Sequence, residues 1–176
     1  MKSPSGSTNN SSQADEIQID RSAFNENGNS QQALSLQKMK HARESEQKLK
    51  EIIPKAFKLI EEDNEEGLKK LLNDNRDVPV DEILDSRGYS LLHEATFQDS
   101  TKLVRVLIRH GRMTLKPPKL SDWIDAKTHN DGFSALHFAS FKGNPDSCEL
   151  LIDNGADIYA RNNFGINMVH VAAQGD

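Results

Sequence analysis

The sequence predicts an all-α solenoid, in which pairs of antiparallel helices repeat along the chain behind a solvated helix and a disordered tail. Three observations support this prediction: a recurring motif, a helical pattern of apolar residues between its copies, and a polar N-terminal composition. The motif places a Gly five residues before a His, and successive copies lie 44 and 33 residues apart. The copies are Gly88 with His93, Gly132 with His137, and Gly165 with His170. A period near 33 residues is typical of stacked helical repeats, because one hairpin alone cannot bury its apolar faces.

Residues 1–32 are predicted to form a disordered tail. They are mainly Ser, Asn, Gln and Gly with scattered acids, and the bulky apolar residues among them are Ile17, Ile19 and Phe24. So little apolar surface cannot offset the conformational entropy that is lost on folding. The alternative is a short docking motif around Ile17 and Ile19.

Residues 33–53 are predicted to form a solvated helix. The segment contains no Gly or Pro and is rich in helix formers, while its middle is polar almost all round. Pro54 follows, and we expect it to open a new helix at the first position. Ala56–Asn73 then predicts two short amphipathic helices separated by acidic residues, which together form an αα-hairpin.

The repeat domain is expected to span residues 54–176. Its predicted parts are a degenerate capping repeat at 54–83, a repeat at 84–111, an inserted finger at 112–122, a repeat at 123–160 and a truncated repeat at 161–176. The insertion explains why the first spacing of the motif is longer than the second.

Each copy of the motif contains residues suited to the start of a helix. Gly88, Gly132 and Gly165 supply a permissive backbone before the helix. Ser90 and Ser134 are natural N-caps, and Asn167 stands at the matching position of the third copy. The histidines recur at matched positions of the three copies, and we interpret His93, His137 and His170 as structural residues.

These motifs resemble those of a known family. The segments at 90–95, 134–139 and 167–172 resemble the Thr-Pro-Leu-His-x-Ala motif of ankyrin repeats. Asn154–Ala160 is similar to the family's hairpin, and Ala56–Asn73 to a degenerate first repeat. The family's Pro is replaced, in order, by Leu91, Ala135 and Met168. The resemblance implies an ankyrin-repeat solenoid with short β-hairpin fingers, whose fingers and first helices bind protein partners.

The inserted finger is the candidate partner contact. Arg112, Lys116 and Lys119 alternate with apolar residues and lead to Trp123, while two consecutive prolines favour an extended polyproline II conformation. Trp and Arg are enriched at interface hot spots, so we expect these four residues to contact a partner. The alternative is that Trp123 packs against the neighbouring finger and the loop is a neutral insertion.

Composition argues against several other functions. A net charge of −5 leaves no basic excess for sequence-independent nucleic-acid binding. No run approaches the ~20 apolar residues that span a bilayer, and the N-terminus lacks the apolar core of a secretory signal. The single cysteine, Cys148, cannot form a disulfide framework and fits the reducing cytoplasm; we interpret it as a core thiol.

No catalytic constellation or phosphate-binding loop is found in the sequence, so we expect neither catalysis by this chain nor a cofactor. A metal site is not expected either. The three motif histidines lie one per repeat, whereas a structural zinc site needs convergent ligands, usually four.

Three functional classes remain: a protein-binding adaptor, the substrate-recruitment domain of a membrane enzyme, and a signalling enzyme or channel that bears the same module. His-Val-Ala-Ala-Gln-Gly-Asp at 170–176 is similar to the ankyrin portion of palmitoyltransferases with an Asp-His-His-Cys active site. That resemblance implies an array facing the cytosol that recruits protein substrates, with the catalytic and membrane-tethering parts downstream.

The last repeat lacks a second helix equivalent to Pro145–Asp153. Apolar faces in the preceding repeat then have no next neighbour, and repeat arrays need a terminal cap. We therefore expect an N-terminal fragment of a longer protein, which frays from Phe164 onward and is stabilised by its natural downstream residues.

Overall fold

The computed structural model describes residues 26–175, with side chains from residue 33 onward, and these residues form helices without any strand. The elements are α1 (Glu26–Glu61), α2 (Glu65–Asp74), the 3₁₀ helix η1 (Val80–Glu82), α3 (Leu91–Phe97), α4 (Thr101–Thr114), α5 (Lys119–Ile124), α6 (Ala135–Phe141), α7 (Pro145–Asp153) and α8 (Met168–Ala172). The fold is therefore an all-α solenoid, as predicted. None of these helices is long and apolar enough to cross a membrane.

The N-terminal boundary of α1 differs from the prediction. Most of the tail expected at 1–32 lies outside the described residues, but residues 26–32 belong to α1. Once a helix exists, each further residue adds a hydrogen bond at little cost, and the Gln-Gln-Ala run at 31–33 consists of helix formers. The chain divides into two units, Met1–His41 and Ala42–Asp176, which are described separately. In the first unit, the apolar residues Leu34, Leu36 and Met39 are exposed.

Pro54 does not open a new helix, contrary to the prediction, because it lies inside α1. A proline in a helix removes one backbone hydrogen bond, here the bond to the carbonyl of Lys50 four residues earlier. Lys50 is exposed, so water can satisfy that carbonyl. The neighbouring Ile52 and Ala56 are buried in the core and hold both sides of the proline in one helix.

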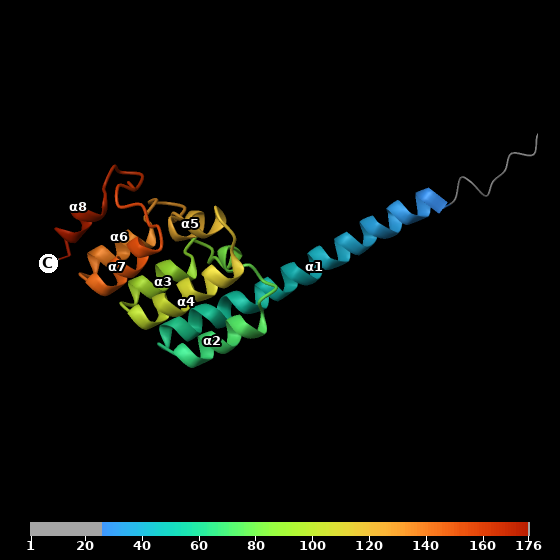
Figure 1. Cartoon of the computed structure of the whole chain (residues 1–176), viewed down its shortest axis with the longest axis horizontal. Coiled ribbons are helices and arrows are strands. Elements are labelled where there is room, and N and C mark those ends of the chain that lie inside the picture. Colours follow the sequence, from blue (N-terminus) through green and yellow to red (C-terminus); the bar gives the residue numbers. More distant parts are fainter. Residues whose placement is uncertain (1–25, 176) are drawn as a thin grey trace, which may run out of the picture. The chain divides into compact units, whose positions relative to one another are not determined.

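The helices of the second unit form two layers (Figure 1). In the first-helix layer, α6 packs against both α3 and α8. In the second-helix layer, α4 packs against both α2 and α7. The layers meet through the pairs α3 with α4 and α6 with α7. Leucines from both layers are fully buried between them: Leu68, Leu92, Leu103, Leu107, Leu136 and Leu151.

A residue with a left-handed backbone conformation follows the first helix of each pair. Asp63, Asp99 and Gly143 have φ values of 51°, 58° and 63°. Aspartate tolerates this conformation better than most residues do. Each turn is also bonded to the next one, because Ser100 Oγ donates to Asp63 Oδ1 at 2.6 Å and Asn144 Nδ2 donates to Asp99 Oδ1 at 2.6 Å. The α1–α2 pair thus continues the regular stack of the later pairs.

The insertion is helical, so the extended conformation predicted for 112–122 is wrong. α4 continues to Thr114, and α5 occupies Lys119–Ile124. Leu120, Trp123 and Ile124 have the i, i+3, i+4 spacing of an amphipathic helix, and the last two are buried. Burial of this apolar face stabilises a helix more than the prolines favour an extended chain.

α4 continues beyond Gly111, where the predicted repeat ends, and Gly111 serves as a packing site. A Cβ atom at Gly111 would lie 2.6 Å from Trp123 Cζ3 and 3.3 Å from Leu120 Cδ1. The absent side chain therefore makes room for the indole of Trp123.

Candidate functional site

The motif histidines connect neighbouring repeats. The Ser90 backbone N–H donates to His93 Nδ1 at 2.9 Å, so Nδ1 is the acceptor and Nε2 carries the proton. Nε2 lies 3.0 Å from the Ala126 carbonyl oxygen and 3.1 Å from that of Phe133, both 33 or more residues away. One imidazole thus contacts the start of α3 through Nδ1 and the segment between α5 and α6 through Nε2.

His137 repeats this arrangement one repeat later. Its Nδ1 accepts from the Ser134 N–H at 3.2 Å, and its Nε2 lies 3.1 Å from the Ile166 carbonyl oxygen. At the third copy, the His170 backbone N–H donates to Asn167 Oδ1 at 3.2 Å, and the imidazole is exposed. Gly88, Gly132 and Gly165 precede these helices with φ values of 77°, 71° and 77°.

Burial keeps the imidazoles of His93 and His137 neutral at pH 7. It lowers the pKa of His93 from 6.5 to about 4, although the Ala126 and Phe133 carbonyls oppose the shift. Burial likewise lowers the pKa of His137. Both ring nitrogens of each residue are engaged by the backbone, and among residues 33–175 no group of three or more His, Cys, Asp or Glu is placed to hold a metal ion.

An apolar hollow lined mainly by aromatic rings lies on the first-helix layer. We call it the aromatic groove; its volume is about 210 Å³ and its lining is Phe97, Phe133, His137, Phe138, Phe141, Ile166, Val171 and Gln174. Phe138 is central, with its ring centroid 6.1 Å from that of Phe97 and 5.8 Å from that of Phe133. Phe97 and Phe141 remain 45% and 44% exposed, which makes them accessible to a ligand.

Sequence reasoning missed the aromatic groove, although the repeat register contains its signal. The residues four positions after each motif histidine are Phe97, Phe141 and Gln174, and all three line the groove. The residues one position after His137 and His170 are Phe138 and Val171, which line it as well. Equivalent positions of stacked repeats face the same side, so aligning the three copies would have located this surface.

Two cations lie on the aromatic cluster that contains the groove. Lys142 Nζ is 4.7 Å from the centroid of the Phe97 ring, and the Arg87 guanidinium is 4.5 Å from that of Tyr89. The Tyr89 ring in turn lies 5.6 Å from Phe138. Each cation is placed to interact with the negative face of its ring. Arg87 is also paired with Asp85 at 2.8 Å, so the positive charge at this surface comes mainly from Lys142.

The residues proposed from the insertion lie on α4, on α5 and in the loop between the two helices. Trp123 is only 3% exposed and packs in the core, which contradicts its prediction as a direct partner contact. The ammonium of Lys119 lies 3.6 Å from Oδ2 of Asp81, a residue of η1. Arg112 on α4 and Lys116 in the loop before α5 are exposed, and their contact with a partner stays a prediction.

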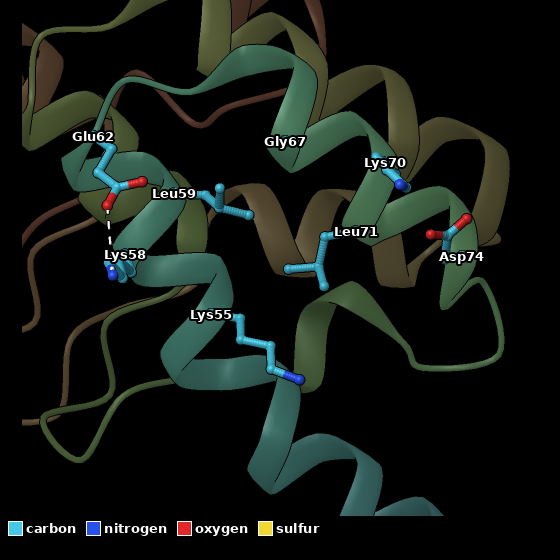
Figure 2. A pocket seen from close by; sticks show the side chains of 8 residues that line it. All are labelled: Lys55, Lys58, Leu59, Glu62, Gly67, Lys70, Leu71 and Asp74. Atoms are coloured by element: carbon cyan, nitrogen blue, oxygen red, sulfur yellow. Dashed lines mark ion pairs between the residues drawn. The ribbon is translucent and has the colours of Figure 1, made fainter.

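A second hollow, of about 410 Å³, separates the end of α1 from α2 (Figure 2). Leu59 and Leu71 project into it from the two helices, and lysines and carboxylates surround them. Lys58 Nζ lies 3.6 Å from Glu62 Oε1. The charges are mixed in sign and the hollow is wide, so it offers no convergent set of polar groups for one ligand.

Cys148 is half-buried on α7, with its sulfur 3.6 Å from Ser140 Oγ. Burial raises the pKa of its thiol, although the Ser140 hydroxyl opposes this. The thiol is therefore protonated at neutral pH, whereas a nucleophilic cysteine requires the thiolate.

Comparison with known proteins agrees with this architecture. A family model of ankyrin repeats, in three copies, matches residues 57–162. The chain is 33% identical over 96 residues to ankyrin repeat and SOCS box protein 3 of Bos taurus, which covers 54% of this chain and 16% of that protein. It is 30% identical over 76 residues to palmitoyltransferase AKR1 of Eremothecium gossypii, which covers 43% of this chain and 9% of that protein.

A solved structure shows the same fold. A chain in the crystal structure of the yeast ribosomal protein Rps3 in complex with its chaperone Yar1 matches with a TM-score of 0.63 at 22% identity. The match covers 73% of this chain and 85% of that chain. At this identity, the similarity is one of fold.

Proposed function

Because the chain belongs to the ankyrin-repeat family, we propose that it is a protein-binding scaffold that holds its partner in the aromatic groove. The observation that supports this most strongly is the pair Phe97 and Phe141. They stand at equivalent positions of successive repeats, and close to half of each side chain is exposed. The role of this chain is then binding rather than catalysis, and its partner is a protein.

The physical properties of the groove suit an apolar side chain of a partner. Large aromatic rings bury much area at low entropic cost, and aromatic residues dominate interface hot spots. The groove is fixed in shape by edge contacts of Phe138 with Phe97 and His93, both at 88° between ring planes. A preformed surface loses little entropy on binding, which favours affinity.

The test is quantitative binding of the partner recovered from cells by the wild-type chain. The double variant Phe97→Ser/Phe141→Ser is expected to weaken that binding by at least about tenfold, because each truncated hot spot costs more than about 1 kcal/mol. Ile152→Ser is the matched control, since Ile152 is a similarly exposed apolar residue (39%) on α7 of the other layer. Unchanged affinity of the double variant, or equal losses in both variants, would refute binding through the groove.

A second candidate is recruitment of protein substrates for a membrane S-acyltransferase. The similarity to palmitoyltransferase AKR1 favours it, at 30% identity over 76 residues. On this proposal the repeats lie on the cytosolic side of a membrane and are tethered through downstream sequence. Sequencing of the transcript beyond the codon for Asp176 tests it: a Cys-rich segment with Asp-His-His-Cys and apolar spans would support the proposal, and their absence would refute it.

A further inference from the structure

The exposed side of α4 carries a row of arginines, which we call the arginine stripe: Arg105, Arg109 and Arg112. Their i, i+4, i+7 spacing places them on one face of the helix. At a rise of about 1.5 Å per residue, the stripe extends over about 10 Å. It lies in the second-helix layer and is separate from the aromatic groove.

The charges of the stripe are not neutralised within the chain. None of the three guanidiniums forms an ion pair with a carboxylate of residues 33–175, whereas Lys69 and Lys102 on the same layer are paired with Glu65 and Asp63. The chain as a whole has a net charge of −5. What distinguishes these three cations is that they follow one another along one face of a single helix, so together they mark a place for an external anion.

Hollows lie on both sides of the stripe. One, of about 360 Å³, is lined by residues of α2 and α4 and contains Arg105, Arg109 and Arg76. Its acidic residue, Glu65, is paired with Lys69. The other, of about 510 Å³, is lined by residues of α4, by Leu150 of α7 and by Asn154 at the C-terminal end of α7. This second hollow has no acidic residue in its lining, and its apolar floor includes Met113, which is 65% exposed.

An unpartnered polar group lies in the first hollow. His110 lines it and is only 6% exposed, and its Nε2 atom has no hydrogen-bond partner within residues 33–175. Buried polar atoms are nearly always paired, so an atom without a partner calls for an explanation. His110 directly follows Arg109 in α4, so this unpaired group lies beside the stripe.

We propose that the arginine stripe binds an extended acidic segment of a partner protein, with carboxylates on alternate residues. Alternate side chains of an extended chain repeat at about 6.6 Å, which is close to the rise of about 6 Å between Arg105 and Arg109. A guanidinium presents paired donors that match a carboxylate. A double-stranded nucleic acid is the less suitable polyanion: it carries one charge per about 1.7 Å of its axis, so a chain with a net charge of −5 repels it more strongly than a short acidic segment.

This proposal rests on the proposed function, since it names the chemistry of a protein partner. The two can fail separately because they use different helix layers. If stripe variants keep the native partner while Phe97→Ser/Phe141→Ser loses it, the stripe proposal falls and the groove remains. If the stripe variants lose the native partner while Phe97→Ser/Phe141→Ser keeps it, the groove proposal falls and the stripe proposal remains.

The probe is a fluorescein-labelled peptide of four Glu-Ser repeats, titrated with the 176-residue chain and followed by fluorescence anisotropy. The triple variant Arg105→Gln/Arg109→Gln/Arg112→Gln is expected to bind about tenfold more weakly, since three exposed ion pairs are lost together. The matched control is Lys38→Gln/Lys40→Gln/Arg43→Gln, which removes the same charge from exposed positions of α1. It is expected to change the affinity less than about twofold.

Several results would overturn the proposal. Equal losses in the two triple variants would show that net charge alone attracts the peptide. A Gln-Ser peptide that binds as well as the Glu-Ser peptide would remove the role of the carboxylates. A twelve-nucleotide oligo-U that binds more tightly than the peptide, and loses affinity in the same stripe variant, would assign the stripe to phosphates. No binding of the Glu-Ser peptide by the wild type would also overturn it.

Discussion

Lowering the pH from about 7.5 to about 5 is expected to destabilise the repeats through His93. Its pKa is about 4 in the folded chain and 6.5 as a reference for the unfolded chain. Because the folded pKa is the lower one, the unfolded chain binds more protons than the folded chain between these two values. The free energy of unfolding therefore decreases as the pH is lowered across this window. The contribution is complete above about pH 6.5 and is lost on the way to about pH 4.

The magnitude follows from the two values. At about pH 5 the unfolded imidazole is almost fully protonated and the folded one about one-tenth, so the loss is about 2 kcal/mol. Protonation is costly for a structural reason. The Ser90 N–H points at Nδ1, so a proton on that nitrogen would displace the bond that starts α3.

Urea unfolding at both pH values measures this effect. The variant His93→Gln cannot titrate, so its loss of stability between the two conditions should be about 2 kcal/mol smaller than that of the wild type. Burial lowers the pKa of His137 and raises the pKa of Asp125. Both groups add the same pH dependence to the stability of the wild type and of the variant, so their effect cancels in the comparison. Carboxylates with lowered pKa, such as Asp63 and Asp77, titrate below the window.

Two results would refute this reasoning. One is an equal pH dependence in the wild type and the variant. The other is an NMR titration in which the His93 ring has a pKa near 6.5, because this would mean that the imidazole is solvated or charged in the folded chain.

Three further predictions concern packing, backbone and the insertion. Trp123→Ala should destabilise the chain by about 3–5 kcal/mol in urea unfolding without changing affinity for the partner, because the indole fills the space at Gly111; a loss below about 1 kcal/mol would contradict its place in the core. Gly143 has φ +63° and open space around it, so Gly143→Ala should lower the free energy of unfolding by about 1 kcal/mol. Gly132 has φ +71°, and a Cβ there would lie 2.4 Å from Asn163 Oδ1, so Gly132→Ala should lower it by at least about 1 kcal/mol more. Equal losses in the two variants would show that Asn163 moves away freely. Lys116→Gln should weaken capture of the partner if the insertion contacts it, and unchanged capture would remove Lys116 from the interface.

The repeat pattern was sufficient to predict the fold because its residues act locally. A Gly before the helix, a cap at Ser90 and an imidazole at His93 determine one helix start, and the same set recurs at the next copies. Stacking then follows from apolar faces that one pair of helices cannot bury alone. The period therefore predicted the solenoid without knowledge of any long-range contact.

The insertion and the groove were harder to predict for opposite reasons. In the insertion, two prolines suggested an extended chain, but long-range burial of Trp123 against Gly111 stabilises a helix. In the groove, no single residue differs from an ordinary aromatic, and the site exists only because Phe97, Phe138 and Phe141 come together from neighbouring helices. Such a surface is visible in the sequence only when the repeats are aligned on their histidines.

Site-specific photo-crosslinking tests the central claim, that the first-helix layer holds the partner. Benzoylphenylalanine is introduced in place of Phe141, on the groove, or of Ile152, a similarly exposed residue on α7. The groove position is expected to crosslink the partner and the α7 position is not. Crosslinks from Ile152 alone, or equal crosslinks from both positions, would contradict binding through the aromatic groove.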